Sequence, residues 1–514
     1  MNIGLSTLTS ALFDHRGFCM SNRKRALSLS IIGVFVCAAI FYYLPLRQIQ
    51  AQQPQDDREK LAKTPAPTGT LNDRLDKDDG YAAALFFSAD IGGNLEVCGC
   101  PIRPLGGVAR RLGYINAFRQ RSPEAATIMV DAGHIFSDEL DETGKLNADA
   151  KLMNDWIGRA VAQMDLAVIN VAHRDLFYAR RFVDNPEFLH DSRYISANIL
   201  PPPQLGGGPP PYSIKTLTGK RLKKPVRLAF IGLSEFPPEE KKDKIAKLGF
   251  TFTDPLETAK KTLAEIKDKA DINIVVGYFK PATANKLALQ NPELDLIIAY
   301  DDRGIVSDPK QVNNTLILYA TKQAKYLGEL RFYAAANGEI ERFTNRYVEL
   351  DKVIPDDPAM LVMTKKARAE IDVVQQRVAE EVAAAHKDQP TIYATSETCA
   401  KCHQEEYDKW KTTRHANAFA GLETKNRTFD NACVGCHSVG FQKQGFINIK
   451  ATPNFANVQC ESCHGPGAEH AAKPQKKIYK TPPVPSTCIT CHDRENSPDF
   501  VFDKYWPMVA HGKK

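Results

Sequence analysis

The C-terminal part of this 514-residue chain repeats one short pattern, C-x-x-C-H, four times between residues 399 and 492. A structural zinc site uses cysteine pairs but gives no reason for a histidine directly after each pair. Covalent haem attachment does need that histidine, because two thioether bonds place the next residue beneath the iron. The repeat therefore predicts four c-type haems, in preference to zinc sites or disulfides. The predicted attachment cysteines are Cys399, Cys402, Cys433, Cys436, Cys460, Cys463, Cys488 and Cys491, and the predicted proximal ligands are His403, His437, His464 and His492.

Each haem iron can take a second protein ligand on its other side. Beyond the four proximal histidines, residues 390–514 contain only His415, His470 and His511, and Met508 is their only methionine. At most one haem can therefore have His/Met ligation, and we expect His415, His470 and His511 to act as distal ligands. A second histidine gives the iron a lower reduction potential than a methionine does, so a low-potential electron carrier is expected.

Three candidate distal histidines for four irons leave one iron without a partner, and two explanations stay open at this point. Either His386 reaches in from the preceding segment, or one haem is five-coordinate and open to a small ligand. The first makes this part of the chain an electron conduit alone. The second permits redox chemistry on a small nitrogen compound such as hydroxylamine or nitric oxide.

The C-terminal segment, residues 389–514, is short for its predicted cofactor content. It leaves about 31 residues for each of four haems, too few for a conventional apolar core. We therefore expect a small, mainly α domain in which short helices and loops surround the porphyrins.

Several stretches of this segment resemble tetrahaem cytochromes c of the cytochrome c five-fifty-four type. They are CAKCHQEEYDKWKTTRHANAFAGL from Cys399 to Leu422, followed by CVGCHSVG, QCESCHGPGAEH and CITCH. In that family a tryptophan-led segment after the first haem motif supplies a distal histidine, which Trp410 and His415 match here. The segment of the third motif supplies another, which His470 matches. The resemblance also implies one high-spin, open haem.

Near the N-terminus, an uncharged run of 21 residues from Ala26 to Leu46 is long enough to cross about 30 Å of hydrocarbon. Because residues 23–25, directly before this run, are basic, we expect residues 1–25 to lie in the cytoplasm. No small-x-small cleavage site follows, so we prefer an uncleaved transmembrane anchor to a cleaved signal peptide. The polar residues 47–79 then predict a linker, and the rest of the chain is expected in the periplasm.

The composition limits the partners of the protein. A net charge of +6 is small for this length, and no arginine-rich stripe with interleaved aromatic residues is present, so nucleic acid is not an expected partner. A single-pass protein of the cytoplasmic membrane with exported haems would instead meet a redox partner protein or a quinol-linked complex.

Residues 80–352 alternate short apolar runs with amphipathic segments, which is typical of a layered α/β domain. Leu256 to Lys269 has apolar positions at helical spacing. Asn337-Gly338, between alternating runs, predicts a hairpin over Gly328 to Leu350 that closes the domain. The predicted buried strands are Ala83 to Asp90, Thr127 to Gly133, Leu166 to Ala172, Val226 to Ser234, Ile272 to Phe279, Leu294 to Asp301 and Thr315 to Thr321.

The polar residues at these strand ends, including Asp90, His134 and His173, resemble the calcineurin-like metallophosphatase and nucleotidase fold, which holds two metal ions there. Several ligands of that fold are replaced, since Gly92 stands where its first histidine belongs and Tyr300-Asp301-Asp302 replaces its late histidines. Two-metal hydrolysis needs both ions clamped about 4 Å apart. We therefore expect the fold without phosphatase activity, and a surviving metal-dependent nucleotidase or phosphatase is the alternative.

Cys98 and Cys100 form a C-G-C sequence in which a mutual disulfide is difficult to close. Three interpretations remain: structural thiols, a redox-active or metal-binding pair, and an adventitious disulfide. Together with Asp90, His134 and His173, the two cysteines suggest a remodelled site for a divalent metal at the strand ends. In the alternative, Asp90 caps a turn and both histidines are neutral and hydrogen-bonded.

Residues 353–388 connect the two large parts of the chain. Asp357 to Lys387 lacks internal glycine and, after its start, proline, and it predicts a long solvated spacer helix. The sequence as a whole therefore predicts a multidomain protein with a transmembrane helix, an α/β layered metallophosphatase-like domain and a multihaem cytochrome c domain. Electron transfer is its expected function.

Overall fold

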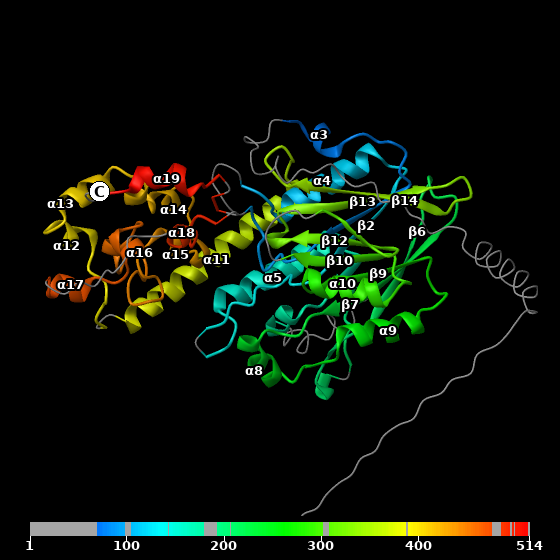
Figure 1. The fold of residues 1–514 in the computed structure, drawn as a ribbon, viewed down its shortest axis with the longest axis horizontal. Coiled ribbons are helices and arrows are strands. Elements are labelled where there is room, and N and C mark those ends of the chain that lie inside the picture. The colour runs from blue at the N-terminus through cyan, green and yellow to red at the C-terminus, as the bar shows by residue number, and fades with distance from the viewer. Residues whose placement is uncertain are drawn as a thin grey trace, which may run out of the picture. The chain divides into compact units, whose positions relative to one another are not determined.

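A computed structural model of the chain describes its fold (Figure 1). The residues described are 69–97, 104–141, 143–178, 193–205, 207–301, 308–386, 389–474, 485–493, 496–497 and 499–511. The predicted anchor at residues 26–46, most of the predicted linker, Cys98 and Cys100 lie outside them. None of the helices within these ranges combines the length and the apolar character that crossing a membrane requires.

The first sheet has six strands in the order β14-β13-β1-β2-β3-β4. β1 to β4 run parallel, whereas β13 is antiparallel to both β1 and β14. β13 and β14 form the predicted hairpin, and Gly338 in its turn has the positive φ, 83°, that glycine adopts readily. The bounds are β1 (Ala83–Ser88), β2 (Ala126–Asp131), β3 (Val168–Asn170), β4 (Tyr194–Ile195), β13 (Tyr326–Ala334) and β14 (Ile340–Glu349).

The second sheet has six strands in the order β11-β12-β10-β9-β7-β6, with antiparallel strands at its two edges. Two short strands, β5 (Ile199–Leu200) and β8 (Thr251–Phe252), pair separately. Each of the seven strands predicted from the sequence is confirmed, with ends within two residues of the prediction. The bounds are β6 (Tyr212–Leu217), β7 (Val226–Ser234), β9 (Ile272–Tyr278), β10 (Leu296–Asp301), β11 (Lys310–Val312) and β12 (Thr315–Thr321).

The two sheets pack face to face around a shared apolar core. Leu85 and Phe87 of β1 point into this core and meet side chains of the second sheet such as Phe230 and Ile274. Phe86, between them in sequence, belongs to the core on the outer face of the first sheet. This alternation follows from the two-residue period of a strand and lets both faces of each sheet be buried.

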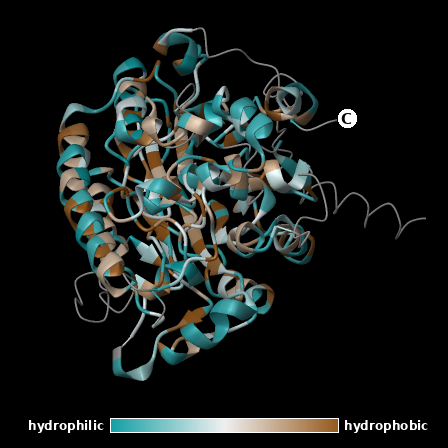
Figure 2. Ribbon diagram, turned by 90° about the vertical axis from the view of Figure 1, so that its left-hand side faces the viewer, coloured by the Kyte–Doolittle hydropathy of each residue, from teal (hydrophilic) through white to brown (hydrophobic). Residues whose placement is uncertain are grey.

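Helices cover the outer face of each sheet. Phe118 of α4 and Trp156 of α5 pack on the first sheet, and Leu263 of α9 and Leu287 of α10 pack on the second. Hydrophobic and hydrophilic residues alternate along the helices in Figure 2, as expected for helices with one buried face. The result is the four-layered α/β architecture. The helices are α3 (Leu71–Leu75), α4 (Val108–Arg121), α5 (Ala148–Gln163), α8 (Glu239–Lys247), α9 (Pro255–Glu265) and α10 (Pro281–Gln290), with the short 3-10 helices η1 (His173–Asp175), η2 (Pro203–Leu205) and η3 (Lys322–Ala324).

Helix α9 is shorter than the sequence predicted. It begins where Asp254 accepts hydrogen bonds from the backbone N–H groups of Leu256 and Glu257. It ends at Glu265 rather than Lys269 because the chain turns there, with Asp268 at a φ of 65°. Apolar residues keep their helical spacing beyond Glu265, so this spacing alone did not predict where the helix ends.

The long connecting helix α11 (Pro358–Ala385) is confirmed, but its description as a solvated spacer is wrong for its first half. Met360 and Ile371 on this helix belong to the core on the outer face of the first sheet. Trp156 Nε1 of α5 donates to Glu370 at 3.1 Å, which adds a polar contact. In Figure 1, α11 runs from α5 toward the short helices of the C-terminal segment.

The C-terminal segment consists of short helices and loops, as predicted. A small apolar cluster that includes Phe419, Val434 and Phe455 is its buried core. Within the described residues of this segment, the β structure is a single isolated bridge between Ser438 and Ala456. The helices are α12 (Ser396–Ala400), α13 (Gln404–Lys411), η4 (Arg414–Asn417), α14 (Ala420–Glu423), α15 (Asn431–His437), η5 (Pro453–Phe455), α16 (Cys460–His464), α17 (Ala468–Ala472), α18 (Pro485–Cys488) and α19 (Phe502–Val509).

Candidate functional site

The four C-x-x-C-H motifs share one local geometry. Each lies on a helical turn: the first begins in α12, the second and third lie in α15 and α16, and the fourth begins in α18. At the first and fourth motifs, the histidine N–H donates to the carbonyl of the first cysteine, at 2.9 Å and 2.8 Å. Residues three and four apart lie on the same face of a helical turn, so both thiols and the imidazole face one side.

Three of the four motif histidines face a second histidine ring. The ring centroids lie 6.3 Å apart for His403 and His470 and 5.9 Å apart for His415 and His492. They lie 5.8 Å apart for His464 and His511. Two imidazoles whose nitrogens each lie about 2 Å from one metal have ring centroids roughly 6 Å apart. The three separations therefore fit an iron between the rings of each pair, and they bring together every distal candidate with one motif histidine.

His437, in the second motif, differs from the other three. Its Nδ1 lies 2.6 Å from the carbonyl oxygen of Ala418, which leaves Nε2 as the nitrogen that can bind metal. No other histidine ring among the residues the structure describes faces it. His386, the alternative partner, lies at the exposed end of α11 with Nδ1 2.8 Å from the carbonyl oxygen of Val382. Among the described residues, the second motif is therefore the one whose histidine has no second histidine ring opposite it.

The distal candidate His415 is held by its neighbours. Trp410 Nε1 donates to the carbonyl oxygen of Val458 at 2.8 Å, and the N–H of Val458 donates to the carbonyl oxygen of His415 at 3.2 Å. These two bonds tie α13 and η4, which follow the first motif, to the segment before the third motif. They give a structural reason for the tryptophan and histidine that the sequence singled out.

The motifs are neighbours in an order that differs from their order in sequence. A hydrogen bond with Cys460 raises the pKa of Cys399 and lowers that of Cys460 to about 7, and Cys436 and Cys491 are joined in the same way. These contacts place the first motif beside the third and the second beside the fourth. Burial raises the pKa of Cys463 to about 11, with a further contribution from the nearby Cys488, so the third motif also lies near the fourth.

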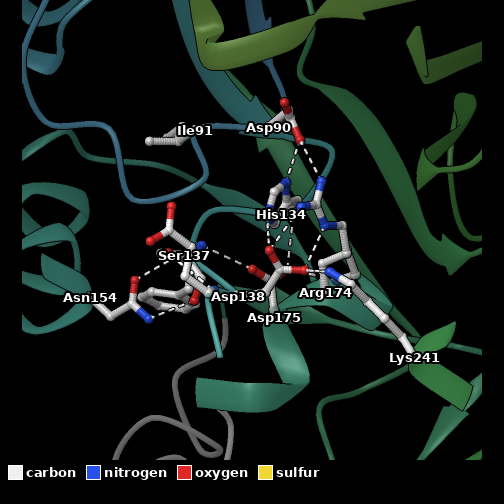
Figure 3. A network of polar contacts seen from close by, with 12 residues as sticks. Asp90, Ile91, His134, Ser137, Asp138, Asn154, Arg174, Asp175 and Lys241 are labelled. Atoms are coloured by element: carbon white, nitrogen blue, oxygen red, sulfur yellow. Dashed lines mark hydrogen bonds and ion pairs between the residues drawn. The ribbon is translucent and has the colours of Figure 1, made fainter. Parts of the chain in front are cut away.

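A second candidate site lies at the carboxyl ends of β1 and β2 (Figure 3). His134 Nδ1 is hydrogen-bonded to Asp90 Oδ1, and His134 Nε2 lies 3.7 Å from Asp138 Oδ1. Arg174 donates two hydrogen bonds of 2.8 Å to Asp138, and Lys241 Nζ donates to the same carboxylate. We call these five residues the strand-end cluster.

Backbone conformation and neighbouring side chains fix the strand-end cluster. Asp90 and His134 both have positive φ, 56° and 58°, a conformation that residues other than glycine adopt rarely and mainly at functional sites. Tyr278, at the end of β9 in the second sheet, donates to Asp90 at 3.0 Å. The buried carboxylate of Asp175 accepts hydrogen bonds from the backbone N–H of His134 at 2.9 Å and of Phe136 at 3.1 Å.

The cluster compensates its own charges. Burial alone would lower the pKa of His134, but Asp90 and Asp138 outweigh it and raise the pKa to about 9. Burial would raise the pKa of Asp90, but the charge of His134 outweighs it, and the pKa lies below its ordinary value. Three cationic side chains, His134, Arg174 and Lys241, therefore surround the carboxylates of Asp90 and Asp138 at neutral pH.

The described cluster does not fit a metal centre. Guanidinium and ammonium groups bind the carboxylate of Asp138, whose oxygens a hard metal ion would need. Across the part of the chain that the structure describes, no group of three or more His, Cys, Asp or Glu side chains is placed to hold a metal ion. Arg174, Lys241 and Asp138 were not predicted from the sequence. Of these three residues, only Asp138 could have been found from the sequence, because it lies four residues after His134.

Of the residues predicted for a remodelled metal site, Asp90 and His134 come together, whereas His173 has another partner. His173 Nδ1 lies 3.3 Å from Ser234 Oγ, and burial lowers its pKa to about 3, so this side chain is neutral and hydrogen-bonded. Cys98 and Cys100 lie outside the described residues, and a metal site that includes them stays a prediction.

The C-terminal segment is similar to known cytochromes. Residues 398–465 match the family model described as cytochrome c554 and c-prime. Cytochrome c-554 of Nitrosomonas europaea is 39% identical over 85 residues, which cover 13% of this chain and 36% of that protein. The family match includes the first three C-x-x-C-H motifs and His415. The chain thus resembles a multihaem redox family over this segment and spans about a third of the curated relative.

The N-terminal region resembles calcineurin-like phosphoesterases and nucleotidases. The uncharacterized metallophosphoesterase YunD of Bacillus subtilis is 33% identical over 120 residues, which cover 23% of this chain and 24% of that protein. Among solved structures, the sulfate thiohydrolase SoxB of Thermus thermophilus in complex with glycerol aligns with a TM-score of 0.48 and 14% identity. That alignment covers 57% of this chain and 62% of the SoxB chain.

Proposed function

We propose that this protein is a membrane-anchored multihaem c-type cytochrome that transfers electrons on the periplasmic side of the cytoplasmic membrane. The observation that carries the proposal is the set of three histidine pairs with ring centroids 5.8 to 6.3 Å apart. Each pair joins one C-x-x-C-H histidine to one of the three histidines that remained after the motifs were assigned. Ordinary packing of six imidazoles gives no reason for this one-to-one pattern.

In this proposal each C-x-x-C-H motif holds one haem through two thioether bonds, which gives four haems. A bound haem iron supplies reversible one-electron transfer. Each pair of histidines would supply two ligands to one iron and would keep small ligands away from it. The pairs that would hold iron are His403 with His470, His492 with His415, and His464 with His511, and His437 would be the single histidine that holds the fourth iron.

The spatial order of the motifs supports transfer along the segment. The contacts between Cys399 and Cys460 and between Cys436 and Cys491 bring attachment points of different motifs together. Haems attached at these cysteines would lie close to one another, because cysteines of different motifs are in contact. Electrons would therefore pass between motifs in the order first, third, fourth and second.

The single histidine of the second motif supports a second candidate function. An iron held by His437 alone could bind a small ligand, since no second histidine among the described residues faces this ring. A redox enzyme acting on hydroxylamine or nitric oxide at this position is the corresponding proposal. Binding of nitric oxide to one haem in four tests it.

The proposed location and partners rest on the sequence alone. The uncharged run from Ala26 to Leu46 supports a single-pass anchor, and covalent haem attachment is typical of exported domains. We propose a redox partner protein or a quinol-linked complex as the electron source or acceptor. Carbonate extraction of membranes and protease accessibility of the C-terminal segment test the anchor and its orientation.

The α/β domain is proposed to be non-hydrolytic. The support is the strand-end cluster, in which Arg174 and Lys241 bind the carboxylate of Asp138. A surviving nucleotidase or phosphatase is the alternative. Phosphate release from nucleotides in the presence of added divalent metals would establish that alternative and contradict the proposal.

Intact-mass spectrometry of protein matured with haem tests the cofactor count. The expected mass exceeds that of the polypeptide by four haems. A variant with Cys433→Ser and Cys436→Ser is the matched control and should retain three covalently bound haems. An unmodified mass, or a mass that rises with added zinc instead, would contradict the cytochrome proposal.

A further inference from the structure

One arginine of the cytochrome segment binds carboxylates from two different parts of the chain. Arg427 Nη2 donates to Glu96, which lies in the loop after β1 of the α/β domain. Arg427 Nη1 donates to Asp430 Oδ2 at 2.8 Å. The side chains of Arg427, Glu96 and Asp430 are 24%, 30% and 12% exposed, so solvent screens this ion network only partly.

Asp430 in turn fixes the start of α15. Its Oδ1 accepts from the backbone N–H of Ala432 at 3.1 Å, which caps the helix. Its Oδ2 also lies 3.4 Å from Arg368 Nη1 of α11. Arg368 donates to Gln375 at 2.8 Å, and Gln375 donates to Asp149 of α5 at 3.1 Å. The cap residue of α15 is therefore tied to the α/β domain by two routes, one through Glu96 and one through α11.

The helix held in this way carries the motif whose histidine faces no second histidine ring among the described residues. α15 includes Cys433, Cys436 and His437. Arg427 bonds the cap residue of this helix, Asp430, which lies three residues before Cys433. Of the ion pairs the structure describes, none joins residues 69–353 to the helices of the other three motifs.

We propose that Glu96 and Arg427 are positioning residues for the haem of the second motif, and that the α/β domain sets the reduction potential of this haem through them. The inference goes beyond the proposed electron transfer and rests on it in one respect, that the second motif carries haem. A nearby positive charge favours the reduced iron and a nearby negative charge favours the oxidised iron, because reduction adds one electron. Arg427 and Glu96 therefore act on the potential in opposite directions.

Redox titration of the full-length, haem-matured protein tests the proposal, with the optical and paramagnetic signals of the high-spin haem as the readout. Arg427→Gln is expected to shift this haem to lower potential and Glu96→Gln to shift it to higher potential. The other three haems should keep their potentials in both variants. Lys450→Gln is the matched control, because it removes a positive charge from the same segment in an exposed pair with Glu380 of α11.

Opposite shifts in Arg427→Gln and Glu96→Gln, absent from Lys450→Gln, support electrostatic control by the α/β domain. Shifts in the same direction, or unchanged potentials in both variants, overturn it, since loss of packing alone gives no reason for opposite signs. The unchanged low-spin signals of the other three haems show in the same samples that each variant is folded.

Hydrogen exchange provides a readout that does not depend on the spin state of any haem. The amides of Ala432 and Val434 are expected to exchange faster in Arg427→Gln than in the wild type, because the cap of α15 has lost one of its two anchors. If the wild type contains no high-spin haem, the open-haem proposal fails, and this exchange alone decides the domain contact. Unchanged exchange in that case overturns the positioning role.

Discussion

Histidines and carboxylates gather at two places in this chain, and the two clusters differ in how they are satisfied. In the strand-end cluster, His134 binds Asp90 directly, and Asp138 is bound by Arg174 and Lys241. In the C-terminal segment, three pairs of histidine rings face each other at 5.8 to 6.3 Å. This separation of the ring centroids is longer than a direct hydrogen bond between two ring nitrogens gives. It fits one metal between the two rings.

The difference teaches how side chains that neutralise one another can be distinguished from side chains that a metal could hold. In the strand-end cluster, the positive charge beside the carboxylate of Asp138 comes from the side chains of Arg174 and Lys241. In the C-terminal segment, the paired histidines face one another at a spacing that fits one metal between them. The same residue types therefore support opposite conclusions in the two parts of the chain.

Removing one distal histidine is expected to have the largest effect. His470→Ala should convert the haem of the first motif from low spin to high spin, so that one of three low-spin irons changes completely. Paramagnetic resonance of the haem-matured variant measures the change. His386→Ala is the matched control and should leave all signals as in the wild type, because the ring of His386 is bonded to the carbonyl oxygen of Val382. An unchanged spectrum for His470→Ala would break the assignment of the pairs.

Removing the shared carboxylate of the strand-end cluster should destabilise the α/β domain. Asp138→Asn leaves His134, Arg174 and Lys241 with less negative charge around them, at an expected cost of about 2 to 3 kcal/mol. This is less than for a fully buried pair because Arg174 is 32% exposed. Urea denaturation measures the cost. Asp271→Asn, which breaks the exposed pair with Arg227, should cost at most about 1 kcal/mol. Equal costs for the two variants would show that the cluster contributes no more than a surface pair.

The stability of the α/β domain should fall as pH rises above neutral. The folded-state pKa of His134 is raised from 6.5 to about 9, so its contribution is fully present below pH 6.5 and is lost as pH rises through 9. The expected slope between these values is at most about 1.4 kcal/mol per pH unit. Thermal unfolding against pH measures it, and His134→Gln should flatten the profile in this window. A wild-type profile that is already flat between pH 6.5 and 9 would contradict a charged His134.

The smallest expected effect is that of added metal on the α/β domain. If the folded domain bound a metal ion, a free metal concentration a hundred times the dissociation constant would stabilise the folded state by about 2.7 kcal/mol. We expect no change in the unfolding temperature of the full-length protein with Mn²⁺ or Mg²⁺, because cations of the protein already surround Asp90 and Asp138. A rise that Asp90→Asn abolishes would show that the site retains metal binding.

Much of the fold was predictable because its signals are local. Buried strands such as Val226–Ser234 and Thr315–Thr321 appear as continuous apolar runs, and the Asn337-Gly338 turn marks the hairpin. These runs did not predict how the strands pair into two packed sheets, since strands far apart in sequence build each sheet. The burial of α11 was missed for a similar reason, because the charged residues along this helix conceal its apolar face.

The two sites were predictable to different degrees. Attachment cysteines and distal histidines follow from counting residues within one segment, although only the structure shows which histidine faces which. The strand-end cluster depends on Lys241, which lies in a polar helix and has no sequence signal of a role at the site. The bond from Arg427 to Glu96 joins residues 331 positions apart, and neither residue stands out in the sequence.

The most direct test of the proposed function is low-temperature paramagnetic resonance, with optical spectra, on the haem-matured protein. We predict three low-spin signals of bis-histidine haems and one high-spin haem assigned to the motif of His437. Four low-spin signals would contradict the open position at His437, and the absence of bis-histidine signals would contradict the three histidine pairs.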